Sequence, residues 1–352
     1  MTVDPKHKTN DDCRKRDPER QNRLLRDQFG RTATYLRLSV TDRCDLRCTY
    51  CMAENMTFLP RKDLLSLEEL YRLTTIFMEH GVRKIRLTGG EPLVRKNVMS
   101  LFENLSRHLA NGDLDEVTLT TNGSLLSRYA RDLARFGVKR VNVSLDTLDG
   151  DRYRAITRWG SINRVFAGLD AAQDAGLHVK LNAVAQKGAF EKELNDLIRF
   201  AHGRGMDLTL IEEMPLGGAA SCRHSSFLSL ADLRHRLEQE WSLEPLAVTT
   251  GGPAKYVRIS ETGGRLGFIT PMSCDFCSDC NRIRLSCTGE LYTCMGQEGG
   301  LSLRDALRQS DGNEIVAQLL RQKVFEKPSG HDFLIEDRQV RGLTRAMSTL
   351  GG

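Results

Sequence analysis

The chain has 352 residues, of which 40% are hydrophobic and 28% charged, a composition typical of soluble globular proteins. It contains no run of about 18 apolar residues, which excludes a membrane-spanning helix, and its polar start lacks the pattern of a secretion signal. Residues 1–31 carry nine Lys or Arg against six Asp or Glu, so the rest of the chain holds only +2 of the formal charge of +5, and aromatic residues make up only 6%. We therefore expect a cytoplasmic protein that has no membrane partner and no nucleic-acid partner.

The pattern of the first two thirds of the chain predicts alternating strands and helices. Residues 1–30 are polar and poor in aliphatic side chains, and we interpret them as a disordered N-terminal extension. The predicted strands are 35–40, 84–88, 116–121, 140–145, 178–184 and 208–214, and the predicted helices between them are 66–80, 97–110, 125–136, 162–175 and 190–203. Such an alternation predicts a parallel sheet, either an incomplete barrel or a doubly wound sheet.

Polar residues recur where the predicted strands end, and this favours the barrel. In a (β/α) barrel these ends converge on one mouth, whereas a doubly wound sheet uses a single switch point. We predict an α/β fold in which residues 31–217 form an incomplete (β/α)6 TIM-like barrel. Residues 218–352 are predicted to form a C-terminal α+β domain that closes the barrel, with helices at 229–240 and 313–325 and β-structure at 254–269.

Eight of the ten cysteines lie in two groups, and the first group follows the first predicted strand. Cys44, Cys48 and Cys51 have the spacing Cys-x3-Cys-x2-Cys. Structural zinc sites normally use four ligands in two separated pairs, so three thiolates within eight residues favour an iron–sulfur cluster with one iron left open. The amino and carboxylate groups of S-adenosylmethionine (SAM) can bind such an iron.

This segment, with Tyr50 before its third cysteine, resembles the signature of the radical SAM superfamily. Gly89-Gly90-Glu91-Pro92, after the second predicted strand, resembles the second motif of that superfamily. The resemblance implies that a 4Fe–4S cluster on the three cysteines cleaves SAM to a 5′-deoxyadenosyl radical. The residues that the resemblance places against SAM are Tyr50, Gly90, Ser144 and Met214.

The second group comprises five cysteines between residues 274 and 294. Cys277 and Cys280 form a Cys-x2-Cys pair, and Cys294 follows them. These three thiols are suited to a second cluster with an open iron, but the spacing also permits a tetrahedral zinc site. Cys274 and Cys287 lie in the same stretch, and if either bound the cluster its open iron would be lost.

The residues around the second group resemble the GTP 3′,8-cyclases of molybdenum cofactor biosynthesis. The resemblance rests on FCxxCNRxR followed by GxLxxC, on LRLSVTDRCxLRCxYC at 36–51, and on the terminal Gly351-Gly352, and it spans the chain from about Phe29. It implies that Cys277, Cys280 and Cys294 hold a second 4Fe–4S cluster that binds the purine. It places Arg37, Arg86, Thr121, Lys180, Arg282 and Arg284 at GTP, and it assigns Gly351 and Gly352 an assisting role in the radical step.

The same resemblance implies the reaction and its partners. GTP would be converted to (8S)-3′,8-cyclo-7,8-dihydroguanosine 5′-triphosphate through abstraction of the ribose H3′. Because the chain has no Gly-x4-Gly-Lys-Ser/Thr loop, arginines must bind the phosphates. The implied partners are a flavodoxin- or ferredoxin-type electron donor and the next enzyme, cyclic pyranopterin monophosphate synthase; the sequence leaves a homodimer open. Two alternatives also stay open: a two-cluster peptide maturase and, more distantly, a zinc-binding regulator.

Overall fold

The computed structural model describes residues 23–214, 226–273, 277–309 and 313–331, and the backbone of the short strands β13 (Ile335–Glu336) and β14 (Gln339–Val340). Cys274, Gly351 and Gly352 lie outside the described residues, so the expectations for them stay predictions. No helix in the described part of the chain is long and apolar enough to cross a membrane.

The first half of the chain has the predicted alternation, with bounds within two residues of those expected. Its elements are β1 (Tyr35–Ser39), α3 (Leu67–Glu79), β2 (Lys84–Thr88), α4 (Val98–Ala110), β3 (Glu116–Thr121), α5 (Leu126–Arg135), β4 (Arg140–Ser144), α6 (Gly150–Thr157), α7 (Ile162–Asp174), β5 (His178–Ala185), α8 (Ala189–Gly203) and β6 (Asp207–Glu212). The short helix α6 was not predicted.

Local sequence explains where the helices begin. At the start of α3 the Ser66 hydroxyl accepts the backbone N–H of Glu69 at 3.1 Å, and the Glu69 carboxylate accepts that of Ser66 at 2.7 Å, which forms a capping box. Asn97 also precedes a helix but has a left-handed backbone, with φ of 62°, and its side chain makes no capping bond.

Among the described residues after β6 there are three helices and, besides the short β13 and β14, six strands. They are α9 (Leu230–Leu237), β7 (Leu243–Leu246), β8 (Lys255–Ile259), β9 (Arg265–Ile269), β10 (Arg282–Leu285), β11 (Glu290–Tyr292), β12 (Leu301–Ser302), α10 (Arg304–Gln309) and α11 (Asn313–Phe325). The α/β fold built on a parallel sheet is confirmed. Strands β1 to β6 pair in parallel in chain order, and the complete order is β12-β11-β10-β1-β2-β3-β4-β5-β6-β9-β8-β7.

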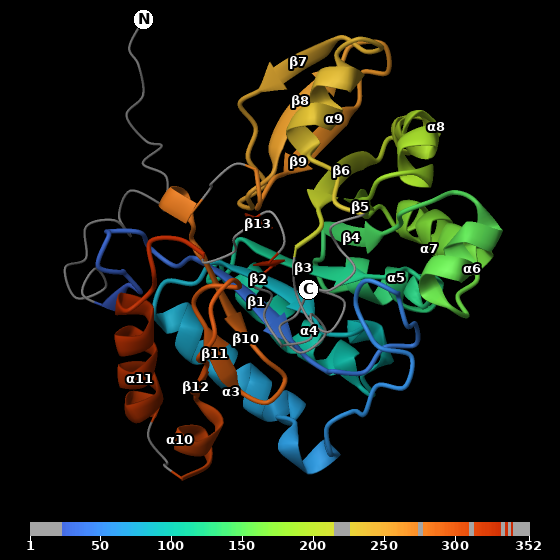
Figure 1. Cartoon of the computed structure of the whole chain (residues 1–352). Helices are drawn as coiled ribbons and strands as arrows, with labels where there is room; N and C mark the ends of the chain where they lie inside the picture. Colours follow the sequence, from blue (N-terminus) through green and yellow to red (C-terminus); the bar gives the residue numbers. More distant parts are fainter. Residues whose placement is uncertain are drawn as a thin grey trace, which may run out of the picture.

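The C-terminal half extends this sheet at both edges. β9 pairs in parallel with β6, and β10 pairs in parallel with β1. Figure 1 shows β7–β9 with α9 on one side of the six-stranded core and β10–β12 with α10 and α11 on the other. An open barrel leaves unpaired N–H and C=O groups at its two edge strands, and β9 and β10 satisfy them.

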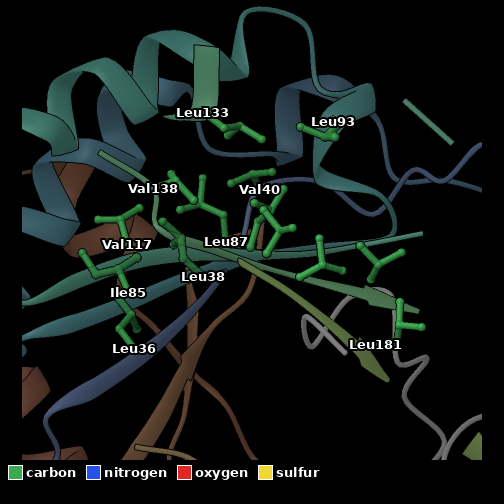
Figure 2. Packing of buried hydrophobic residues seen from close by; sticks show 14 of the residues in the cluster. Leu36, Leu38, Val40, Ile85, Leu87, Leu93, Val117, Leu133, Val138 and Leu181 are labelled. Carbon is green, nitrogen blue, oxygen red and sulfur yellow. The ribbon is translucent and has the colours of Figure 1, made fainter. Parts of the chain in front are cut away.

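The two faces of the sheet differ in polarity because side chains alternate along each strand. Leu36 and Leu38 of β1 and Ile85 and Leu87 of β2 point to the helix side, where Figure 2 shows them packed below Leu133 of α5. Their neighbours in sequence point to the opposite, inner face of the sheet. The inner face is polar, which is expected of a ligand-binding lumen and not of a packed barrel interior.

The N-terminal segment differs from the expectation of disorder over residues 1–30. Leu25 is only 1% exposed, and its backbone N–H donates to His80 O at 3.2 Å. Arg26 pairs with Thr32, and the Gln28 N–H reaches Phe325 O at 3.2 Å. The expectation is wrong for residues 23–30, because one buried leucine and a short turn fix this stretch against α3 and α11.

Candidate active site

Three of the predicted GTP ligands form one row across neighbouring strands. Arg37 in β1 lies directly opposite Arg86 in β2 and Arg284 in β10, so the three guanidinium groups share the inner face. Burial, followed by the neighbouring Arg284, holds the pKa of Arg37 well below its usual range. Burial and Arg282 lower the pKa of Arg284 to about 10. Such a row of buried like charges is costly unless an anion joins it.

A second row lies one step nearer the start of the strands. Tyr35 stands between Lys84 of β2 and Arg282 of β10, and the Lys84 ammonium lies 4.9 Å from the centre of the Tyr35 ring. Glu116 of β3 forms an ion pair with Lys84 at 2.5 Å. Because Arg282 and Arg284 are alternate residues of one strand, both reach the same inner face, as the sequence predicts.

Lys180 of β5 also lies on the inner face, where it is held by the C-terminal half. Its ammonium donates to the hydroxyl of Tyr256 in β8, and that hydroxyl lies 3.0 Å from Thr250 Oγ1. Burial, followed by the charges of Arg86 and Arg140, lowers the pKa of Lys180 to about 7. Sequence reasoning missed Tyr256, because nothing in its strand pattern indicates contact with β5.

The inner face carries buried polar atoms that have no hydrogen-bond partner within the described ranges. They include Tyr35 Oη, Arg86 Nε, Thr88 Oγ1, Thr120 Oγ1, Asn142 Oδ1 and Asn182 Oδ1. Buried polar atoms normally find a partner, so this set on one face of the sheet fits a polar ligand. Thr121, one of the predicted GTP ligands, is the last residue of β3. By the alternation along this strand, its side chain points to the helix side of the sheet and not to the inner face.

The first cysteine group occupies the loop after β1, at the carboxyl end of the sheet. Burial, with Glu91 and Asp45 nearby, raises the pKa of the Cys44 thiol to about 12. The pKa of Cys48 is raised well above its usual value by burial, then by Cys51 and Asp146 and by Cys44. The three thiols therefore influence one another electrostatically, as ligands of one centre must.

The two glycines of the second motif bring β2 against this loop. Gly90 N–H donates to Thr41 O at 2.9 Å, and Glu91 N–H donates to Arg43 O at 2.8 Å. A Cβ on Gly90 would lie 2.3 Å from Arg43 O, and one on Gly89 would lie 2.5 Å from Thr41 O. These glycines thus allow close approach to the backbone just before Cys44, and contact between Gly90 and SAM stays a prediction.

Glu91 is a buried hub behind the first group. Its carboxylate accepts the Thr121 hydroxyl at 2.9 Å and the backbone N–H groups of Asn122 at 2.7 Å and Leu93 at 3.0 Å, and burial raises its pKa to about 7. The Asn122 amide donates to Asp45 at 2.8 Å, beside Cys44. The polar end of β3 is visible in the sequence, but its role in holding this loop is not.

Tyr50 and Ser144, two of the predicted SAM contacts, lie around the same mouth. The Tyr50 hydroxyl donates to Asp146 at 2.7 Å, and Asp146 also accepts the Val184 N–H at 2.8 Å, so one carboxylate joins the cysteine loop to β5. Ser144 is the half-buried last residue of β4. Met214, after β6, differs from them, because it lines a pocket with Cys277, Cys280 and Cys294 of the second cysteine group. The structure thus shows where these residues lie, and their contacts with SAM stay predictions.

The second group lies at the opposite end of the strands. Cys277 and Cys280 precede β10, which is parallel to β1, whereas Cys44 follows β1. β11 runs back antiparallel to β10 and returns Cys294 to the same end. Cys277, Cys280 and Cys294 line one pocket with Arg282 and Arg284.

Cys287 lies apart from these three thiols. It is 1% exposed, and its carbonyl accepts the Leu65 N–H at 2.8 Å. Burial, followed by Asp42, raises the pKa of the Cys287 thiol to about 12, while the Ser39 side chain acts to lower it. The structure therefore places Cys287 beside the end of β1, consistent with a structural thiol.

Both donor sets fit an iron–sulfur cluster by their chemistry. Within the ranges that the structure describes, no three His, Cys, Asp or Glu side chains converge as the ligands of one metal ion do. A 4Fe–4S cluster makes no such demand, because each thiolate binds a different iron. Three thiols in each group leave one iron of each cluster for an exogenous ligand.

Comparison with known proteins agrees with this architecture. A model of the Radical SAM superfamily matches residues 38–201, and a model of Molybdenum Cofactor Synthesis C matches residues 206–333. Among solved structures, that of SuiB from Streptococcus suis bound to S-adenosylmethionine has a TM-score of 0.60 at 16% identity, over 86% of this chain and 74% of that chain. Native anSMEcpe with bound AdoMet has a TM-score of 0.55 at 15% identity, over 85% and 82%. The fold and the thiol loop are those of a radical SAM enzyme, with SAM and an iron–sulfur cluster as its cofactors.

Curated relatives define the family more narrowly. A GTP 3′,8-cyclase from Mesorhizobium japonicum is 60% identical over 93% of this chain and 99% of its own length. One from Brucella melitensis biotype 2 is 59% identical over 93% and 95%. The chain belongs to the GTP 3′,8-cyclase family. This membership favours a nucleotide cyclase over a peptide maturase or a zinc-binding regulator.

Proposed function

We propose that this chain converts GTP to (8S)-3′,8-cyclo-7,8-dihydroguanosine 5′-triphosphate, the first step of molybdenum cofactor biosynthesis. The observation that carries the proposal is the row formed by Arg37, Arg86 and Arg284 on the inner face, between the two cysteine groups. Planar guanidinium groups pair well with phosphate oxygens, and a triphosphate offers negative charge that balances this row. Lys180 and Arg282 extend the same polar face.

Cys44, Cys48 and Cys51 would hold the first cluster. When bound, this cluster and SAM supply a 5′-deoxyadenosyl radical that takes the H3′ atom from the GTP ribose. The chain's own contribution is position. Asp146 fixes the Tyr50 hydroxyl at 2.7 Å, and the backbone at Gly90 is pressed against the loop that carries the thiols. Ser144 and Met214 are the further SAM contacts that we propose.

Cys277, Cys280 and Cys294 would hold a second cluster whose open iron binds the purine. A substrate held by its purine at one end and by its triphosphate on the arginine row has little freedom at the ribose. That constraint favours one C–H bond and one ring closure over the many other reactions open to a carbon radical. The Thr121 hydroxyl donates to Glu91 and accepts the Gly123 N–H at 3.1 Å, so it would meet GTP only through its remaining lone pair.

The proposal also includes the partners implied by the family. A flavodoxin- or ferredoxin-type protein would donate electrons, and cyclic pyranopterin monophosphate synthase would consume the product. Gly351 and Gly352 would assist the radical step. Cytoplasmic location and a homodimer belong to the same set of expectations.

One anaerobic experiment tests the function. The reconstituted protein is incubated with GTP, SAM and dithionite, and the nucleotides are separated by chromatography and analysed by mass spectrometry alongside iron and sulfide content. We expect a nucleotide product isomeric with GTP, together with 5′-deoxyadenosine, from protein that holds about eight irons per chain. Cys48→Ser is the matched control and should form neither. Unchanged GTP from fully loaded protein would refute the proposal.

A further inference from the structure

Lys327 is a buried cation beside the second cysteine group and has no part in the function described above. It is 3% exposed and follows α11, whose buried residues Val316, Leu320 and Val324 fix the end of the helix. A buried ammonium group is costly unless strong acceptors surround it. Its position therefore requires an explanation from its contacts.

All three N–H donors of this ammonium group point to the Cys280 turn. Lys327 Nζ donates to Cys280 O at 2.6 Å, to Arg282 O at 2.9 Å and to the Cys280 sulfur at 3.4 Å. An ammonium group has three donors, so these acceptors use its full capacity. The sulfur bond matters most, because a carbonyl is a common partner of lysine and a thiolate that ligates a metal is not.

A second cation holds the other side of the same turn but differs in its charge balance. Arg31 Nη1 donates to Cys277 O at 2.6 Å and to Ser329 O at 2.9 Å, while its Nε pairs with Asp27 at 2.5 Å. The carboxylate of Asp27 offsets the charge of Arg31. The contacts of Lys327 are two carbonyl oxygens and one sulfur, so its charge acts on the thiolate.

We propose that Lys327 is a positioning residue for the second cluster, where its hydrogen bond to the Cys280 sulfur makes that cluster easier to reduce. The proposal rests on the second cluster of the proposed function. One-electron reduction adds negative charge to the cluster and breaks no bond, with the electron coming from an external low-potential donor. N–H donors to the sulfurs of a cluster stabilise this added charge.

The test isolates the second cluster in the full-length chain. In the background Cys44→Ala/Cys48→Ala/Cys51→Ala only the second group can bind a cluster, and about four irons are expected. An EPR-monitored titration with dithionite then compares this protein with the same protein carrying Lys327→Met. We expect the ratio of reduced to oxidised cluster at a fixed potential to fall about tenfold, the size of one charge-assisted bond.

Matched variants separate charge from packing. Lys323→Met, four residues earlier and within α11, removes a half-buried lysine and should leave the ratio unchanged. Lys327→Gln keeps an N–H donor without the charge and should shift the ratio less, in the same direction. It becomes the deciding measurement if Lys327→Met does not take up a cluster.

The outcomes distinguish the two proposals. A background protein that binds no iron–sulfur cluster would contradict the second cluster, and with it the proposed function. A background protein that holds about four irons, and whose titration is changed neither by Lys327→Met nor by Lys327→Gln, would contradict only the role of Lys327.

Discussion

The two cysteine groups differ in the charged side chains that surround them. Around the first, burial and the carboxylates of Glu91 and Asp45 raise the pKa of Cys44 to about 12. In the second, burial raises the pKa of Cys294, whereas at Cys280 the charges of Arg282 and Lys327 outweigh burial and lower the pKa to about 7. Two thiols that we propose as cluster ligands, Cys44 and Cys280, thus have pKa values shifted in opposite directions.

The difference matches the ligands that each end would receive. SAM carries a sulfonium cation and an ammonium group, and carboxylates near the first group favour positive charge. GTP carries a polyanion, and the arginine row near the second group favours negative charge. The first cysteine group follows β1, and the second precedes β10, which pairs with β1 in parallel. The length of these two strands therefore separates the electrostatic surroundings of the two groups.

The largest effect is expected from a substitution at Gly90, whose backbone contact shapes the loop of the first cysteine group. In Gly90→Ala the new Cβ would lie 2.3 Å from Arg43 O, and neither main chain can give way without moving the loop that leads to Cys44. We expect loss of about four irons and of SAM cleavage, while the second cluster remains. Iron analysis and assay of 5′-deoxyadenosine measure this.

A glycine in open surroundings provides the control. Gly203, the last residue of α8, has no atom within 4 Å of an added Cβ, so Gly203→Ala should keep all its iron and activity. If Gly90→Ala also kept its iron, the close approach would not be what shapes the first end.

A smaller effect is expected from the arginine row. Arg284→Ala removes one guanidinium group opposite Arg37 and should raise the KM for GTP about a hundredfold, the scale of a buried charged hydrogen bond. SAM cleavage without GTP should persist, because the first end is untouched. Arg199→Ala, whose side chain is 61% exposed, is the control. A normal KM in Arg284→Ala would remove the arginine row from the substrate site.

Sequence pattern alone predicts the strand–helix alternation of the barrel well, because each element is long enough to show its period. The alternation of Leu36, Arg37 and Leu38 already indicates that one face of β1 is apolar and the other charged. The alternation also places Arg282 and Arg284 on one face. The spacing of Cys44, Cys48 and Cys51 is enough to predict that they belong to one site, because three thiols within eight residues must lie close together.

Contacts between distant parts of the chain are not visible in the pattern. The pairing of β10 with β1 brings Arg284 opposite Arg37 across 247 positions of sequence, and no local signal encodes that choice. Tyr256 on Lys180 and Lys327 on Cys280 arise in the same way. Leu25 is a single buried leucine in a polar stretch. One leucine is too weak a signal for the sequence to predict that residues 23–30 are ordered.

The middle of the inner face offers a pH-dependent test. Lys180 has a pKa of about 7 because of burial and its cationic neighbours, so without ligand it is largely neutral above pH 7. A bound triphosphate favours the charged form, and binding above pH 7 must therefore take up a proton. GTP affinity should fall by up to about tenfold per pH unit from pH 7 to the raised pKa of the complex.

Calorimetry in two buffers of different ionisation enthalpy measures this proton directly. Lys180→Met should bind GTP more weakly at pH 7, with no such uptake and a flatter pH profile. Tyr256→Phe keeps the lysine but removes its hydroxyl partner, and it should retain the uptake. Equal proton uptake by Lys180→Met and the unmodified protein would assign the titration to another group.

The smallest effect is expected at Cys287 and tests which cysteines belong to the second cluster. Cys287 lies in its sequence stretch but contacts the end of β1, where its carbonyl accepts the Leu65 N–H. Cys287→Ala should keep about eight irons and lower the free energy of unfolding by about 1 kcal/mol, as expected for a small cavity. Cys294→Ala, from the same stretch, should lose about four irons and so serves as the contrast. Iron loss from Cys287→Ala would mean that a thiol from the far end of β10 is a ligand of the second cluster. The two cysteine groups would then not be separated along β1 and β10.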